Sequence, residues 1–148
     1  MRVVKYDELE SLAGEALGSS EWMEINQERI NTFADATGDH QWIHVDVEKA
    51  TKALGAPIAH GFLTLSLIPF LGAQVMRVEG VTRGINYGLD KVRFTNMVPV
   101  NSKVRATQKL LSVEPKAGGK QLKSEVTIEI EGQERPACVA ETITILYG

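Results

Sequence analysis

Asp39, His44 and the adjacent pair His60 and Gly61 are the residues whose types and spacing could do chemistry. Asp39 precedes His44 by five residues, and His60-Gly61 opens a long apolar run. A carboxylate and an imidazole can together orient and deprotonate water, because either group can titrate near neutral pH in a suitable environment. They would titrate as a coupled pair, so the sequence does not say which one holds the proton. The backbone N–H of Gly61, at the expected start of a helix, could stabilise an oxyanion.

A helix is expected before this Asp-to-His segment. Asn26 or Gln27 is suited to cap a helix that runs to Asp35. The apolar residues of this helix fall on one face. Thr37-Gly38 is suited to end the helix, because glycine tolerates the left-handed backbone of a helix terminus. Asp39 would therefore lie just beyond a helix end.

Two further helices are expected after the segment. Asp46 is suited to cap a short helix over 47–54, which the Gly-Ala-Pro stretch 55–57 ends. Residues 61–78 are apolar on almost every side, which predicts a longer helix buried at the centre of the protein. Pro69 should weaken or kink that helix, because proline has no backbone N–H to donate.

From residue 82 onwards the pattern changes to strands. Val126, Ile128 and Ile130 alternate with polar residues, which predicts a strand with one buried and one solvated face. Turn-forming stretches at 117–120 and 131–134 separate consecutive strands, which favours antiparallel pairing. Helices followed by an antiparallel meander predict an α+β domain. The expected strands are 82–89, 91–94, 103–113, 121–131 and 137–147.

Composition narrows the class of protein. The chain has 148 residues, a length typical of one domain, so we expect residues 1–148 to form a single domain. A net charge of −3 argues against nucleic acid as a partner, because such binding depends on a basic surface. No apolar run reaches the length of a membrane span or resembles a signal peptide. The single cysteine, Cys138, allows no internal disulfide, so we expect a cytoplasmic protein.

Three segments resemble the MaoC-like dehydratase family, which includes the (R)-specific enoyl-CoA hydratases and the nodulation protein N-like proteins. Residues 33–46 are similar to its hydratase motif, in which an aromatic-Ala pair precedes Thr-Gly-Asp and the motif ends in Ile-His-x-Asp. Residues 58–61, Ile-Ala-His-Gly, resemble a second block, and residues 84–94 look like the nodulation protein N-like branch. The resemblance covers nearly the whole chain. It implies a hot-dog fold, in which an antiparallel β-sheet wraps around a long central α-helix.

The resemblance also implies a reaction. Asp39 and His44 would hold a water molecule for reversible addition to a trans-2-enoyl-CoA, giving an (R)-3-hydroxyacyl-CoA. Gly61 would be the oxyanion donor, and an acyl-CoA the substrate. No metal or redox cofactor is expected, because adding water to an alkene changes no overall oxidation state. The family further implies a homodimer with the two sheets side by side. Gln41-Trp42 stands where many (R)-hydratases have Asn-Pro, which bears on the lining of the acyl pocket.

His60 and Ser66 are expected to support the site. His60 could orient its loop or form a hydrogen bond to the backbone, which is a structural role. Ser66 follows Gly61 along the helix and in this family can form a hydrogen bond to the catalytic carboxylate. The alternative for Ser66 is a bond from its hydroxyl to a carbonyl of its own helix. Cys138 lies among apolar residues, which favours a core position over a nucleophile.

Three other functions are compatible with parts of the sequence. His44, Asp46 and His60 could form a two-histidine, one-carboxylate metal site, although only fifteen residues separate the two histidines. The hot-dog fold also serves acyl-CoA thioesterases, which usually carry an acidic residue on the central helix, and residues 61–78 contain none. The third is a non-catalytic acyl-CoA binding protein or partner subunit, which loss of Asp39 or His44 would have indicated, and both residues are present.

Overall fold

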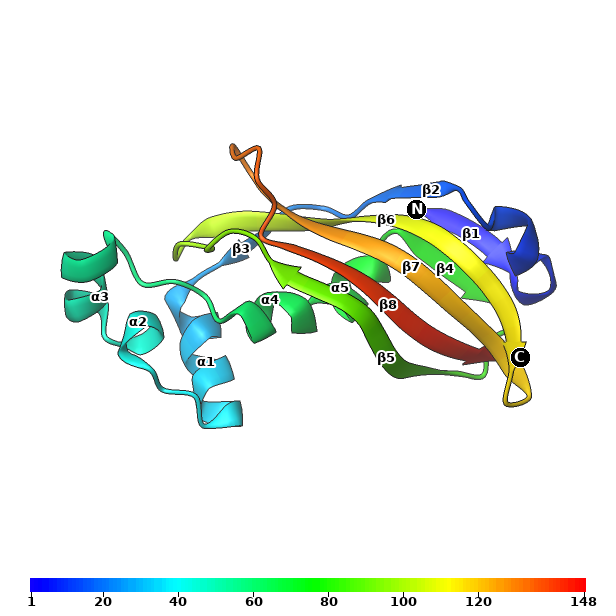
Figure 1. Cartoon of the computed structure of the whole chain (residues 1–148), viewed down its shortest axis with the longest axis horizontal. Coiled ribbons are helices and arrows are strands. Elements are labelled where there is room, and N and C mark those ends of the chain that lie inside the picture. The colour runs from blue at the N-terminus through cyan, green and yellow to red at the C-terminus, as the bar shows by residue number, and fades with distance from the viewer.

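The computed structural model describes residues 1–148 as a curved antiparallel sheet that covers two short helices, with three further helices at one end (Figure 1). The strands of the main sheet run in the order β2-β6-β7-β8-β5, and β3 also pairs with β6. The elements of this sheet are β2 (Ala16–Ser19), β3 (Met23–Ile25), β5 (Arg83–Phe94), β6 (Ser102–Lys116), β7 (Gly119–Ile130) and β8 (Cys138–Tyr147).

The hairpin between β6 and β7 confirms the antiparallel pairing expected from the turn residues. Only Ala117 and Gly118 separate the two strands, and both have positive φ angles, 50° and 82°. Two consecutive residues of positive φ form the type of turn whose twist matches that of the flanking strands. The second turn, which includes Gly132, connects β7 to β8, so β6, β7 and β8 form the expected meander.

Strand β5 differs from the expectation in extent and in neighbour. It is one strand of 12 residues rather than two, and register irregularities fall between Asn86 and Gly88 and between Leu89 and Lys91. The break predicted after Leu89 is therefore a bulge, in which an extra residue bends the strand without ending it. β5 pairs with β8 at the edge of the sheet, because the chain between β5 and β6 crosses to the other side.

The helix expected over residues 61–78 is divided in the structure. α4 (Gly61–Ser66) and α5 (Ile68–Gly72) are separate helices, and β4 (Met76–Glu79) follows them. Pro69 explains the interruption, because it cannot donate the backbone hydrogen bond that would continue the first helix. Residues 76–79 are a strand because they pair in parallel with β1 (Arg2–Lys5), a partner from the far end of the chain. A 3₁₀ helix, η1 (Tyr6–Leu12), follows β1.

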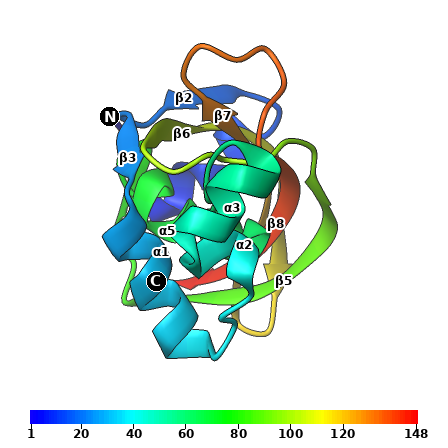
Figure 2. The ribbon, with the colours of Figure 1, turned by 90° about the vertical axis from the view of Figure 1, so that its left-hand side faces the viewer.

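The helices before the central pair form where the sequence predicts them. α1 (Gln27–Thr37) is capped by Asn26, whose side chain accepts a hydrogen bond from the N–H of Arg29, and Gly38 ends it in the left-handed conformation. α3 (Val47–Leu54) is capped by the side chain of Asp46. The short helix α2 (Trp42–Val45), which carries His44, lies between them. Figure 2 shows these three helices gathered across one end of the sheet.

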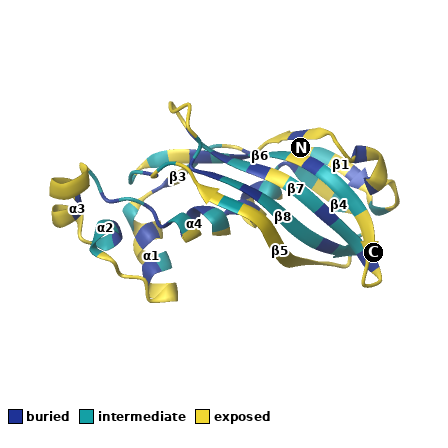
Figure 3. Ribbon diagram, viewed as in Figure 1, coloured by how far each residue is buried: buried dark blue, intermediate teal, exposed yellow.

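The main core lies between the central helices and the concave face of the sheet. A cluster of 16 buried residues includes Leu63 and Leu71 from the helices and Val126 and Ile128 from β7. A smaller cluster packs η1, β1 and β4 against the other end of the sheet. Figure 3 shows that the buried residues follow the inner sheet and that β5 is exposed along most of its length. None of the helices has the length and hydropathy needed to cross a membrane.

Candidate active site

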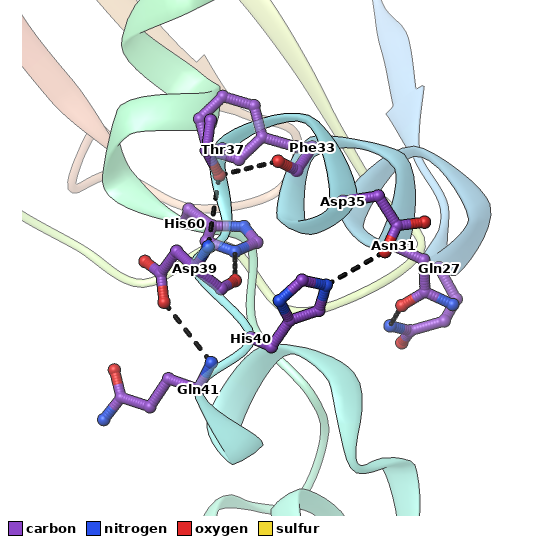
Figure 4. A network of polar contacts seen from close by, with 9 residues as sticks. All are labelled: Gln27, Asn31, Phe33, Asp35, Thr37, Asp39, His40, Gln41 and His60. Atoms are coloured by element: carbon purple, nitrogen blue, oxygen red, sulfur yellow. Dashed lines mark hydrogen bonds and ion pairs between the residues drawn. The ribbon is translucent and has the colours of Figure 1, made fainter.

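Asp39 lies immediately after the end of α1, where the chain turns toward α2. The Thr37 hydroxyl donates to the carbonyl of Phe33 at 2.7 Å and accepts the N–H of Asp39 at 3.4 Å. The carboxylate of Asp39 accepts the N–H of Gln41 at 3.3 Å (Figure 4). These local bonds fix the backbone on both sides of the carboxylate while the side chain stays exposed. Asp39 is therefore held in place and remains free to accept further hydrogen bonds.

His44 is a buried residue in a defined tautomer. Its ring nitrogen Nδ1 lies 2.7 Å from the carbonyl oxygen of Ile58. A carbonyl can only accept, so Nδ1 carries the proton, and in the neutral ring Nε2 holds a lone pair. The Gln27 side chain donates to the His44 carbonyl at 2.8 Å, which ties α2 to α1. His44 thus presents an unprotonated nitrogen, the form that a general base needs.

Burial is the main reason that His44 stays neutral. Its side chain is almost completely enclosed, and loss of hydration lowers the pKa of His44 below the ordinary value of 6.5. Proximity to His60 lowers the pKa further, whereas the bond to Ile58 and the nearby Asp39 act in the opposite direction. The net lowering means that the neutral imidazole predominates at pH 7.

His60 connects the two groups. Its Nε2 donates to the carbonyl oxygen of Asp39 at 3.0 Å (Figure 4). Its ring stacks on that of His44, with centroids 3.8 Å apart. The ring of Phe33 packs against the other side, with centroids 4.8 Å apart. His60 is 2% exposed, and its Nδ1 is buried without a hydrogen-bond partner. These contacts favour the structural role expected for His60, because the ring touches both Asp39 and His44.

The structure brings Asp39, His44 and His60 together. One carboxylate oxygen of Asp39, one ring nitrogen of His44 and one ring nitrogen of His60 all lie within 4.8 Å of one another. Two hydrogen bonds of about 2.8 Å that meet at a water molecule span roughly 4.6 Å, so a single water fits between such atoms. Asp46, the carboxylate of the alternative metal site, instead caps α3 by accepting the N–H of Lys49 at 3.1 Å. The carboxylate beside the two histidines is therefore that of Asp39 and not that of Asp46.

Gly61 begins α4 and opens on the same cavity as His44. Its N–H has no acceptor in the protein, as the first residue of a helix requires. The cavity has a volume of about 460 Å³, and both His44 and Gly61 line it. A Cβ at position 61 would lie 3.0 Å from the ring of Phe94, so close packing also favours glycine here. The free donor and the close packing are both properties of this one residue.

Ser66 lies apart from the carboxylate. Its hydroxyl donates to the Leu63 carbonyl at 2.8 Å, which is the bond within its own helix that the sequence left as an alternative. The carboxylate of Asp39 has no hydrogen bond to it. Ser66 lines a second cavity, with Phe33 and Leu63, on the other side of α4.

Two features of the site were not visible in the sequence. Gln27 was considered only as a helix cap, yet its side chain holds the backbone of His44. The carbonyl of Ile58 fixes the His44 tautomer, and no side-chain type could have indicated a role for a backbone oxygen. Cys138 is confirmed as a core residue, because it is fully buried and burial raises the pKa of its thiol to about 11.

Solved structures of other proteins share this fold. The solved structure of the R-hydratase PhaJ1 from Pseudomonas aeruginosa superposes with a TM-score of 0.75 at 22% identity, covering 96% of this chain and 84% of that one. The (R)-hydratase from A. caviae has a TM-score of 0.71 at 22% identity, with 88% and 95% covered. The sheet curved around a central pair of helices is therefore a hot-dog fold.

Sequence comparison identifies the family. Residues 8–133 match the family model described as MaoC like domain. The 3-hydroxyacyl-thioester dehydratase Z of Mycobacterium tuberculosis is 54% identical over 92% of this chain and 91% of its own length. Nodulation protein N of Rhizobium leguminosarum bv. viciae is 42% identical over 99% and 93%. The chain belongs to the MaoC-like dehydratase family, and this membership makes it an enzyme of the hydro-lyase class.

The environments of the histidines predict different titrations. We expect the pKa of His44 to lie below 6.5, because burial disfavours its charged form. The pKa of His40 should lie above 6.5, because its ring bonds the exposed carboxylate of Asp35 at 2.9 Å. An NMR titration of the ring carbon signals measures both values, and Asp35→Asn should return His40 alone toward 6.5. A His44 midpoint at or above that of His40 would contradict the neutral tautomer.

Proposed function

We propose that the protein catalyses the reversible addition of water to a trans-2-enoyl-CoA, giving an (R)-3-hydroxyacyl-CoA. The observation that carries this proposal is the pairing of a neutral His44 with the carboxylate of Asp39 beside a cavity that Gly61 also lines. The 54% identical relative named as a 3-hydroxyacyl-thioester dehydratase supports the same reaction class. The (R) configuration rests on the resemblance of residues 33–46 to the hydratase motif.

The proposed mechanism needs one water molecule and two proton movements. Water held between Asp39 and His44 loses a proton to this pair as its oxygen bonds to the β carbon of the enoyl group. A proton from the pair then reaches the α carbon, so the atoms of one water are added overall. Charge that accumulates on the thioester oxygen meets the free N–H of Gly61, and such a donor contributes about 2.7–4 kcal/mol to transition-state stabilisation. No oxidation state changes overall.

Substitution of the two groups tests this mechanism. Asp39→Asn and His44→Gln keep side-chain size and remove basicity, so each should lower kcat by about 10²- to 10⁴-fold while the protein stays folded. The measurement is the loss of enoyl-thioester ultraviolet absorbance with crotonyl-CoA and a longer trans-2-enoyl-CoA. An (R)-specific dehydrogenase would identify the product.

Asp35→Asn and His40→Gln provide matched controls for this experiment. They remove a carboxylate and an imidazole of the same types from the exposed pair next to the site, and they should leave turnover unchanged. Release of free CoA without hydration would indicate a thioesterase. Binding of the thioester with neither reaction would indicate a non-catalytic acyl-CoA binding protein. Either result overturns the proposal.

The proposed reaction requires no metal or redox cofactor. Asp39, His44 and His60 nevertheless place three atoms that could bind a metal ion close together. Whether activity depends on a metal ion can therefore be tested directly. We expect dialysis against EDTA to leave turnover unchanged, because the proposed activation of water uses only the two side chains. Activity that is lost on chelation and restored by a single added divalent cation would show that these residues hold a catalytic ion.

We further propose that the protein is a cytoplasmic homodimer joined through β5. This strand ends the sheet, so half of its backbone groups have no partner strand. Its large apolar side chains Ile85, Tyr87, Leu89 and Phe94 are exposed, and so is Phe62 on α4. A second β5 paired with the first would bury this apolar edge and continue the sheet. The single cysteine, Cys138, is buried and unpaired, which suits a reducing compartment.

A charge on the exposed edge should prevent dimer formation. Leu89→Lys would bury an ammonium group in the proposed interface, so we expect it to shift the protein to a monomer in analytical ultracentrifugation. Leu54→Lys is the control, because Leu54 on α3 is also 44% exposed and lies away from β5. A monomeric wild type, or an unchanged dimer in Leu89→Lys, would contradict an interface through β5.

A further inference from the structure

Thr64 is the one buried polar residue whose side chain forms no hydrogen bond within the protein. The buried polar residues of the chain are Ser20, His44, His60 and Thr64. The hydroxyl of Ser20 donates to Glu21 and accepts from Ala106, and each histidine ring bonds a backbone carbonyl. Thr64 is 3% exposed. Its backbone N–H donates to the carbonyl of His60 and its own carbonyl accepts the N–H of Leu67, whereas its hydroxyl has no hydrogen bond within the protein. Leaving a buried hydroxyl unpaired costs stability, so its position calls for a partner outside the chain.

The free hydroxyl opens on the cavity that His44 lines. The only buried side-chain atoms that are both sealed from solvent and unpaired are Gln27 Oε1 and His60 Nδ1. The unpaired Thr64 oxygen is therefore not sealed from solvent, and Thr64 lines the cavity of about 460 Å³. Thr64 follows Gly61 by three residues on α4, so the two residues lie on the same face of the helix.

The other hydroxyl and amide side chains around this cavity already form hydrogen bonds within the protein. The Thr95 hydroxyl donates to the Pro136 carbonyl at 2.5 Å, and the Asn96 amide donates to Gln133 and to the Arg135 carbonyl. Arg135 also lines the cavity, and it is exposed rather than enclosed. Thr64 is consequently the enclosed hydroxyl that a ligand in this cavity can reach without breaking a bond within the protein.

We propose that Thr64 is a further catalytic residue, whose hydroxyl donates a hydrogen bond to the thioester carbonyl oxygen alongside the N–H of Gly61. This inference rests on the proposed hydration of an enoyl thioester. The hydroxyl keeps its proton throughout, and the bond strengthens as negative charge collects on the thioester oxygen. Ser66 is not an alternative donor, because its hydroxyl is used by Leu63 and it lines the other cavity.

Kinetics of three variants test the role. Thr64→Val keeps the shape of the side chain and removes the donor, so kcat should fall by about 10²-fold or more while KM changes little. Thr64→Ser keeps the hydroxyl and should restore most of the loss. Thr51→Val makes the same change on the exposed helix α3 and should behave as the wild type. Circular dichroism checks that all variants are folded.

A spectroscopic measurement separates this role from a structural one. A conjugated thioester such as 4-dimethylaminocinnamoyl-CoA absorbs at longer wavelength when a hydrogen bond polarises its carbonyl group. The wild type and Thr64→Ser should shift the absorbance of the bound chromophore to the red, and Thr64→Val should shift it clearly less at saturation. A structural threonine would leave this shift intact in any folded variant.

The outcomes distinguish the inference from the proposed function. A wild type that hydrates enoyl-CoA, with Thr64→Val equal to it in kcat and in red shift, overturns the inference alone. A wild type that hydrates no enoyl-CoA overturns the proposed function, and the red shift of the bound chromophore then still decides whether Thr64 contacts the carbonyl. Loss of kcat and of the red shift in Thr64→Val, both recovered in Thr64→Ser, supports the assignment.

Discussion

The hydrogen bond between His44 Nδ1 and the carbonyl of Ile58 is the contact on which the candidate site depends. It places the ring proton on Nδ1 and so leaves Nε2 as the nitrogen that can accept a proton. It is reinforced by the N–H of Ile58, which donates to the carbonyl of Ile43 at 3.0 Å. The helix that carries His44 and the segment that leads to Gly61 are therefore locked together by two bonds.

The segment that supplies Ile58 is itself held by the sheet side of the molecule. Ile58 forms an isolated bridge with Pro99, and the N–H of Ala59 donates to the carbonyl of Val98 at 2.9 Å. The same short segment thus contacts α2 on one side and the chain before β6 on the other. The position of His44 is consequently set by long-range contacts, although His44 and Asp39 are close in the sequence.

His60 shows what the site costs in stability. Its Nδ1 is sealed from solvent without a partner, and a buried unsatisfied group of this kind costs about 1–3 kcal/mol. The same ring holds the carbonyl of Asp39 through Nε2 and covers one face of the His44 ring. An apolar residue at this position would avoid the unpaired nitrogen but would leave the Asp39 backbone without its donor. The retained cost is consistent with a residue that positions Asp39 and His44.

Helices and strands that depend on residues nearby in the sequence could be predicted from it. Those that depend on pairing with distant segments could not. Asn26 and Asp46 cap helices through bonds to residues three positions away, and both helices form as expected. Residues 76–79 continue an apolar run that resembles a helix, yet they form a strand because Val3 and its neighbours lie beside them. The N-terminal strands escaped prediction for the same reason, since their pairing with β6 and β4 joins segments far apart in the chain.

The same division applies within the candidate site. The spacing of Asp39 and His44 placed both on the segment after α1, and the structure brings them together with His60. The direction in which a helical side chain points was harder to predict, because α4 is only six residues long and faces two cavities. Ser66 and Thr64 are two residues apart and so project from different sides of the helix. The serine falls on the side of Phe33, and the threonine falls on the side of His44 and Gly61. Of the two hydroxyls on α4, the one that can reach a substrate in the His44 cavity is therefore that of Thr64.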